Sequence, residues 1–117
     1  MTKWKVSFPM SDKGNTEKLL FSLGLCQKAG KTICGVPMIC EAMRKGGAKS
    51  PRIVIEALDT SENTHKRLTD KCKYYSIRHV RISCTVDTLA DALGKSARLG
   101  AVAVTDEGLC RLIEKYI

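Results

Sequence analysis

Apolar residues recur along this chain at two spacings, and the two alternate from segment to segment. An apolar residue at every third or fourth position is typical of an amphipathic helix, whereas a short continuous apolar run is typical of a buried strand. The first pattern predicts helices over about residues 16–28, 36–45, 62–75, 86–93 and 107–116. The second predicts strands over about residues 32–34, 51–55, 79–82 and 101–104. This alternation predicts an α/β fold whose sheet is parallel at least in part, with helices on both faces.

Residues at the ends of these segments support the same bounds. Thr16, Thr85 and Asp106 stand where a side-chain oxygen can accept a hydrogen bond from the first free amides of a helix. Gly30 and Gly94 stand where a helix ends, a position that favours glycine.

The length of 117 residues is that of one domain with one ordinary core. We expect an N-terminal arm over residues 1–15 and a single domain over residues 16–117. In the arm, Trp4, Val6 and Phe8 alternate with polar residues as in a strand, until Pro9 and Gly14 break the pattern.

The chain is basic. Twenty Lys and Arg against twelve Asp and Glu give a net charge of +8, which favours a polyanionic partner. A surplus of solubilising lysines is the simpler account of the same charge. No apolar run approaches membrane-spanning length and no secretory signal is visible, so we expect a cytoplasmic protein with no membrane partner.

Six cysteines are present, and none forms a C-x-x-C pair or has zinc-finger spacing with the two histidines. We interpret them as reduced, buried, small hydrophobic residues, with a metal site or redox pair as the alternative. They are Cys26, Cys34, Cys40, Cys72, Cys84 and Cys110.

The remaining polar residues of interest show no catalytic pattern. His65 and His79 have no ligand spacing and no obvious carboxylate or cysteine partner, so we expect no metal, no cofactor and no enzymatic activity. Glu56 ends an apolar strand, where it indicates either a polar pocket or the rim of the sheet.

The segment 30–46 is the best candidate for binding an anion. Gly35 lets the backbone turn, and Pro37 fits the first turn of the following helix, where a missing N–H does no harm. The free amides and the dipole of such a helix start attract phosphate. The alternative is a solvated basic face. The basic residues around this unit are Lys28, Lys31, Arg44 and Lys45.

Several strings of the chain together resemble the ribosomal protein family L-seven-Ae/L-thirty-e, and most closely its small bacterial ribosomal-like members. The resemblance covers about residues 17–116. It implies a three-layer α-β-α sandwich with a four-stranded mixed sheet, and an RNA-binding protein of the kink-turn type. The strings are Gly30-Lys31, Gly35 with its helix, Gly47-Ala48-Lys49 before Ile53-Val54-Ile55, Ser61-Glu62-Asn63-Thr64, Leu68-Thr69-Asp70-Lys71-Cys72, Tyr74-Tyr75, Leu93-Gly94-Lys95 and Ala101-Val102-Ala103-Val104-Thr105-Asp106.

In that family the RNA face is the turn into the second helix together with the loop before the last strand. The turn carries Gly-x-Asn-Glu-x-x-Lys, and here Gly35 is retained while Pro37, Met38 and Glu41 stand at the Asn, Glu and Lys positions. Pro and Met side chains cannot hydrogen-bond base edges. In the loop, Ala97 and Leu99 could press on an unstacked base or sugar, or simply pack. The predicted RNA-binding residues are Lys28, Lys31, Gly35, Val36, Pro37, Met38, Glu41, Arg44, Lys45, Lys95, Ala97, Arg98 and Leu99.

The leading hypothesis is a monomeric protein of translation or ribosome assembly. Its expected partner is structured RNA, kink-turn-like or ribosomal, with the ribosome or translation factors as further partners. The alternative is a protein-interaction module on the same fold that has lost kink-turn recognition, which Pro37, Met38 and Glu41 support. A third hypothesis, an enzyme with Cys34 or Cys40 as nucleophile, lacks a base.

Overall fold

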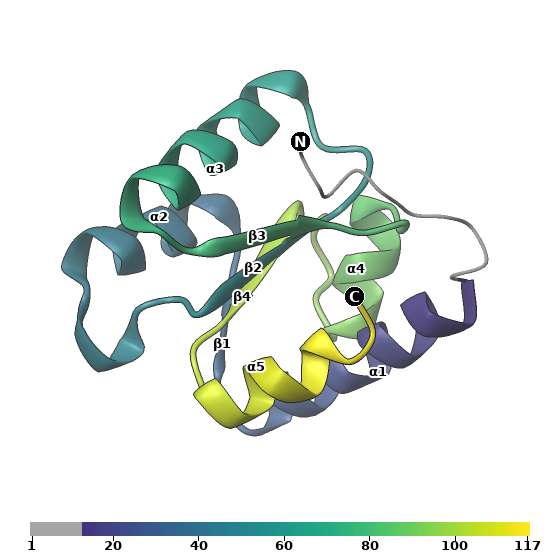
Figure 1. The fold of residues 1–117 in the computed structure, drawn as a ribbon. Coiled ribbons are helices and arrows are strands. Elements are labelled where there is room, and N and C mark those ends of the chain that lie inside the picture. The colour runs from purple at the N-terminus through teal and green to yellow at the C-terminus, as the bar shows by residue number, and fades with distance from the viewer. Residues whose placement is uncertain (1–12) are drawn as a thin grey trace.

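The computed structural model describes residues 13–117, which fold into three layers (Figure 1). The strand pattern of the expected arm lies outside the described residues. The elements in chain order are α1 (Lys13–Lys28), β1 (Thr32–Cys34), α2 (Val36–Lys45), the 3-10 helix η3 (Gly47–Lys49), β2 (Ile53–Glu56), α3 (Glu62–Tyr75), β3 (Arg78–Arg81), α4 (Val86–Ala92), β4 (Ala101–Val104) and α5 (Glu107–Glu114).

The four strands form one mixed sheet in the order β1-β4-β2-β3. Strands β2 and β3 are parallel, and β4 runs antiparallel to both of its neighbours, β1 and β2. Helices α2 and α3 cover one face and α1, α4 and α5 cover the other (Figure 1). The expected α-β-α sandwich with a four-stranded mixed sheet is therefore confirmed.

Alternation along the two central strands divides the core between these faces. Ile53, Ile55, Val102 and Val104 belong to the cluster under α1, α4 and α5, and all are fully buried. Val54, Ala101 and Ala103 belong to the cluster under α2 and α3. Successive side chains of a strand point to opposite faces, so continuous apolar runs are what a sheet covered on both sides requires.

Several predicted bounds are wrong by one to three residues. Strand β2 begins at Ile53 instead of residue 51, and helix α5 ends at Glu114 instead of residue 116. Helix α1 begins at Lys13, so residues 13–15 belong to the helix and not to the expected arm. Thr16 therefore lies inside the helix and does not cap it. Strand β3 begins and ends one residue earlier than the expected 79–82, and η3 was not expected. Local propensity is a weak signal at element ends, where one more turn costs little.

Strands β1, β2 and β3 all end at the same edge of the sheet, where β4 begins. The Gly35 amide donates to the Ala101 carbonyl at 3.0 Å, and Glu56 pairs with both Ala101 and Arg81. We call this the carboxyl edge, and define it by Gly35, Glu56, Arg81 and Ala101. Helices α2, α3 and α4 start from it. No helix of the described chain is long and apolar enough to cross a membrane.

Candidate functional site

Three helices begin at the carboxyl edge, and only two of them are capped by a side chain. The Ser61 hydroxyl accepts the Thr64 amide of α3 at 3.1 Å, and the Thr85 hydroxyl accepts the Thr88 amide of α4 at 3.1 Å. Helix α2 follows Gly35 with no side-chain cap. The partial positive charge of three helix dipoles therefore meets at one edge, and α2 is the member whose amides are left open.

The open start of α2 offers two donors. Its first helical hydrogen bond runs from the Ile39 amide to the Gly35 carbonyl at 3.0 Å, and Pro37 has no N–H. The amides of Val36 and Met38 have no hydrogen-bond partner among residues 13–117. Gly35 has φ 96° and ψ 140°, a backbone conformation that L side chains rarely adopt. Glycine at this position therefore sets the direction in which the two amides point.

The loop before β4 reaches the same edge. Its last residue, Gly100, accepts the Ala57 amide at 2.9 Å, next to the Ala101 carbonyl that holds Gly35. Lys95, Ala97 and Arg98 are exposed, whereas Leu99 is only 6% exposed and packs in the core. Both residues could either press on a base or pack in the loop; the structure leaves Ala97 on the surface and buries Leu99 by packing.

The other predicted cations do not gather at the start of α2. Arg44 and Lys45 lie at its far end, roughly 12 Å along the axis from Val36 at 1.5 Å per residue. Lys31 precedes β1 and lies at the opposite edge, where its carbonyl accepts the Thr105 amide at 3.0 Å. Lys28 ends α1. Only Lys95 and Arg98 stand on a loop that reaches the carboxyl edge.

Glu41, at the position where the family pattern has a lysine, is paired within its own helix. Its carboxylate lies 2.6 Å from Arg44 and 3.9 Å from Lys45. The hydrogen bond and the positive charge of Arg44 lower the pKa of the Glu41 carboxyl. The negative charge that Glu41 brings to α2 is therefore accompanied by two cations of the same helix.

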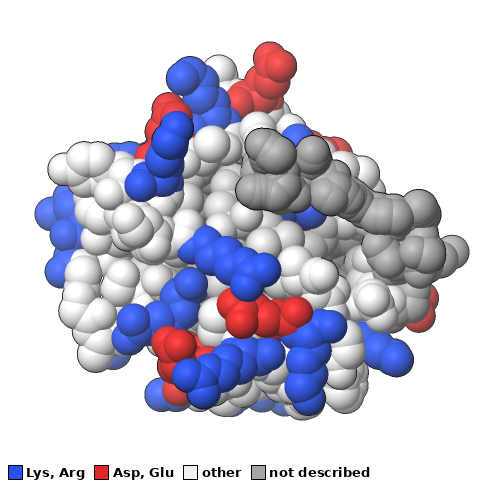
Figure 2. All heavy atoms as spheres, in the orientation of Figure 1, with Lys and Arg blue, Asp and Glu red and all other residues white. Residues whose placement is uncertain are grey.

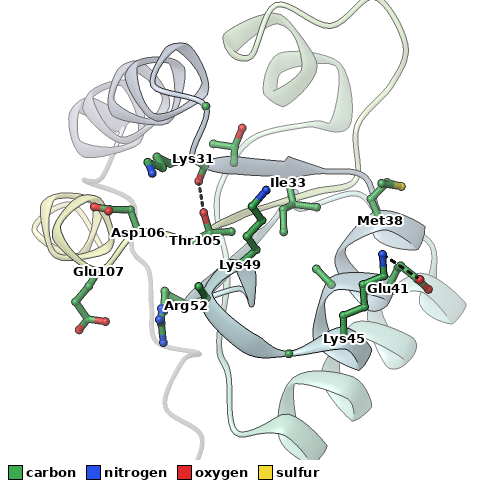
Figure 3. A pocket seen from close by; sticks show the side chains of 15 residues that line it. Lys31, Ile33, Met38, Glu41, Lys45, Lys49, Arg52, Thr105, Asp106 and Glu107 are labelled. Carbon is green, nitrogen blue, oxygen red and sulfur yellow. Dashed lines mark hydrogen bonds and ion pairs between the residues drawn. The ribbon is translucent and has the colours of Figure 1, made fainter.

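A separate hollow of about 920 Å³ lies between β1, α2, η3 and the start of α5 (Figure 3). Met38, Glu41 and Lys45 line it from one side of α2, and Lys31 lines it from the opposite edge of the sheet. Lys49 and Arg52 line it as well, although no pattern in the sequence points to them. Four of the predicted site residues thus line one hollow, which includes neither Gly35 nor Ala97 in its lining and mixes both charge signs.

Several cations of α3 and β3 are paired with acids. Lys66 pairs with Asp70 at 3.4 Å and Arg78 pairs with Glu114 at 2.6 Å. Figure 2 shows Lys and Arg side chains beside Asp and Glu side chains at the upper margin and in the lower middle of the visible face. Such exposed pairs contribute little stability, but they neutralise charge that a nucleic acid could otherwise use.

The expectation that His65 and His79 have no carboxylate partner is wrong. His65 Nδ1 lies 2.8 Å and His79 Nε2 lies 2.7 Å from the same oxygen, Oε1 of Glu56. Glu56 is fully buried, and Thr60 donates to its other oxygen, Oε2. Arg81 Nε lies 3.9 Å from Oε2. The question that the sequence left open about Glu56 is thus answered: it is the centre of a buried polar cluster.

This cluster determines the ionisation of Glu56. Burial alone would raise the pKa of the carboxyl, but hydrogen bonds from His79, Thr60 and His65 outweigh it and hold the pKa below its usual value. The three ligand atoms of Glu56, His65 and His79 all lie within 4.8 Å of one another. Spacing could not reveal this group, because the histidines lie 9 and 23 residues from Glu56.

The six cysteines are all free thiols. Cys26, Cys72, Cys84 and Cys110 are buried, as expected, while Cys34 and Cys40 are half-buried. Burial raises the pKa of Cys72 to about 12 and that of Cys84 to about 11.

Comparison with known proteins identifies the family. Residues 17–113 match the family described as "Ribosomal protein L7Ae/L30e/S12e/Gadd45 family". The chain belongs to this family. The L7Ae resemblance inferred from the quoted strings is thereby confirmed.

Two relatives carry the same name. The chain is 37% identical over 86 residues to "RNA-binding protein YlxQ" of Bacillus subtilis, covering 74% of this chain and 81% of that protein. It is 29% identical over 106 residues to "RNA-binding protein YlxQ" of Enterococcus faecium, covering 91% and 97%. The family and both relatives are described as ribosomal or RNA-binding proteins, in agreement with the expectation that this L7Ae-family member is not an enzyme.

Solved structures share the L7Ae-family fold. A protein of unknown function from Bacillus halodurans C superposes with a TM-score of 0.74 at 28% identity, covering 85% of this chain and 95% of that one. The Giardia lamblia 15.5kD RNA binding protein superposes with a TM-score of 0.73 over 99% and 93% of the two chains. At 14% identity, the second likeness concerns the fold alone.

Proposed function

We propose that this L7Ae-family protein binds structured RNA of the kink-turn type at its carboxyl edge, in translation or ribosome assembly. The observation that carries the proposal is the open start of α2. Of the three helices that begin at this edge, it alone has no side-chain cap. The names of the curated relatives support RNA as the class of ligand.

The RNA backbone binds to the amides of Val36 and Met38. A phosphate oxygen accepts their hydrogen bonds, and the dipole of α2 favours the negative charge. Lys95 and Arg98 add positive charge from the loop that ends beside Gly35. Arg98 already lies 3.4 Å from Asp87, but both side chains are about three-quarters exposed, so a phosphate can replace that carboxylate at little cost.

Recognition of the RNA rests on shape. Pro37 and Met38 replace the Asn and Glu that the family pattern places in this turn, and neither side chain forms hydrogen bonds with base edges. Met38 is 60% exposed and Pro37 is exposed, so they offer an apolar surface for an unstacked base. A folded RNA that presents a bent backbone and an extruded nucleotide fits this combination.

Salt-dependent binding to a kink-turn hairpin tests the proposal. We expect the hairpin to bind more tightly than the same strands paired without the bulge, with an affinity that falls steeply with salt. Arg98→Ala should reduce the slope of log K against log salt by about one. Lys18→Ala is the matched control, because Lys18 is an exposed residue of α1 that is not among the residues proposed to bind RNA, and it should leave the slope unchanged. Equal binding of bent and straight RNA would refute kink-turn recognition.

A protein-interaction role of the same surface is the second candidate. The observation that favours it is the exposed Met38 beside Pro37, because exposed apolar residues without hydrogen-bonding neighbours suit a protein partner. Nuclease treatment before affinity purification separates the two roles. Retention of the same proteins after nuclease, together with no affinity for the hairpin, would favour the protein partner.

A further inference from the structure

We propose that Glu56, His65 and His79 form a binding site for a divalent transition-metal ion, with zinc as the best fit. The three residues come from β2, α3 and β3, so an ion held by them would fasten α3 to the sheet. The inference does not rest on RNA binding, because neither the amides of Val36 and Met38 nor Lys95 and Arg98 belong to the proposed metal site. Glu56 does lie at the carboxyl edge, on the face of the sheet that α3 covers.

Both imidazoles already converge on one carboxylate oxygen. His65 Nδ1 and His79 Nε2 lie 2.8 Å and 2.7 Å from Glu56 Oε1. The two rings lie with their centroids 5.8 Å apart. Three ligand atoms are thus brought to one point by three elements whose positions the core fixes.

The types of ligand select the ion. Two imidazole nitrogens and one carboxylate oxygen suit zinc and its first-row neighbours, whereas magnesium and calcium prefer shells of oxygen. Three protein ligands leave the fourth tetrahedral position to water. A buried carboxylate with two imidazoles therefore points to zinc and not to a hard cation.

The present distances are those of hydrogen bonds, and a metal requires a small expansion. Zinc–ligand bonds of about 2.0–2.1 Å place tetrahedral ligands roughly 3.3 Å apart, so each N···O distance must open by about 0.5 Å. Glu56 and His79 belong to paired strands, but His65 stands on α3 and its side chain is 26% exposed. His65 is therefore the ligand that moves, and the metal replaces the ring protons that point at Oε1.

The other oxygen of Glu56 is held independently. Thr60 donates to Oε2, and such support orients a carboxylate for metal binding. Arg81 Nε lies 3.9 Å from the same oxygen, and its positive charge weakens the attraction for a cation. We therefore expect an affinity below that of a structural zinc site with four protein ligands.

Cobalt(II) titration of the untagged, reduced full-length protein tests the site. We expect one equivalent to bind with visible d–d absorption and without the near-ultraviolet absorption of a cobalt–thiolate bond. Zinc should displace the cobalt and, at a hundredfold excess over its dissociation constant, raise the midpoint of thermal unfolding by roughly 10 °C. Magnesium should do neither.

Variants identify the ligands. His65→Gln, His79→Gln and Glu56→Gln should each weaken cobalt binding at least tenfold. Because Glu56 is fully buried, Glu56→Gln could fail to fold; His65 is partly exposed, so His65→Gln still tests the site in that case. Glu62→Gln, an exposed acid in the first turn of α3, is the matched control and should bind cobalt normally. Absence of stoichiometric binding would overturn the proposal. Cobalt binding that persists in both histidine variants would also overturn it. Loss of cobalt binding in the double variant Cys34→Ser/Cys40→Ser would overturn it too, because the ligands would then be thiols.

Discussion

Replacing Glu56 by glutamine tests how much the buried cluster contributes to the fold. Glutamine keeps the shape of the side chain but removes the charge. Thr60, His65 and His79 then either donate to the neutral amide oxygen or face the amide NH2 group, to which they cannot donate. A hydrogen bond to a charged group contributes about 1.5–3 kcal/mol and one to a neutral group about 0.5–1.5 kcal/mol, so each loses about 1 kcal/mol. Part of that loss is recovered because no charge is buried.

The expected result is a loss of about 2–3 kcal/mol in the free energy of unfolding near neutral pH. That is a large share of the 5–15 kcal/mol typical of a domain. Urea unfolding followed by circular dichroism measures it, with a chelator present so that no metal contributes. Glu62→Gln is the control, because Glu62 is exposed, and should change the midpoint little. A Glu56→Gln protein as stable as the wild type would refute the assignment of a stabilising role to the cluster.

The effect of pH has a definite sign. The pKa of Glu56 is lowered in the folded protein, so its contribution is complete above the unfolded value near 4.5 and is lost as pH falls through the folded pKa. The wild type should therefore lose its advantage over Glu56→Gln below about pH 4.5. A difference that stays constant from neutral pH to pH 3 would contradict this reasoning.

Three further predictions concern other parts of the chain. Gly35→Ala should destabilise the protein by about 1–2 kcal/mol in urea unfolding, because alanine is strained at φ 96°, and should also weaken binding to the kink-turn hairpin. Leu68→Ala should cost about 2–5 kcal/mol by the same assay, because Leu68 is fully buried between α3 and the sheet. A thiol reagent at neutral pH should modify Cys34 and Cys40 well before Cys72 and Cys84, whose pKa values are raised to about 12 and about 11; mass spectrometry of the labelled peptides measures the order.

The elements of the fold follow closely from the sequence. The bounds of α2 and α3 and of strands β1 and β4 agree with those expected from periodicity. Ser61, Thr85 and Asp106 cap α3, α4 and α5. These signals are local: each depends on a few neighbouring residues, so one sequence suffices to read them.

The order of the strands could not be inferred in the same way. Spacing shows that residues 101–104 form a buried strand, but not that β4 inserts between β1 and β2. That order decides which loops share an edge. It places Lys31 and Arg52 at one end of the sheet and Gly35 and Gly100 at the other. The predicted grouping of Lys31 with Gly35 came from their closeness in sequence. Strand β1 lies between them and places them at opposite ends of the sheet.

The Glu56 cluster was missed for the same reason. The available signal was a carboxylate at the end of an apolar run, in a chain with only two histidines. The parallel register of β2 and β3 places Glu56 opposite Arg81, and packing of α3 on that face adds His65. Only long-range pairing joins these residues, so sequence could raise the question about Glu56 but not answer it.

The central claim is that the open amides at the start of α2 hold the RNA backbone, and Val36→Pro compared with Val36→Ala tests it most directly. Proline suits the first position of a helix and removes only the Val36 amide as donor, while alanine shortens the same partly buried side chain and keeps the amide. A hydrogen bond to a charged phosphate contributes about 1.5–3 kcal/mol. We therefore expect the proline variant to bind the kink-turn hairpin about tenfold or more weakly than the alanine variant. Equal affinities of two folded variants would contradict the claim.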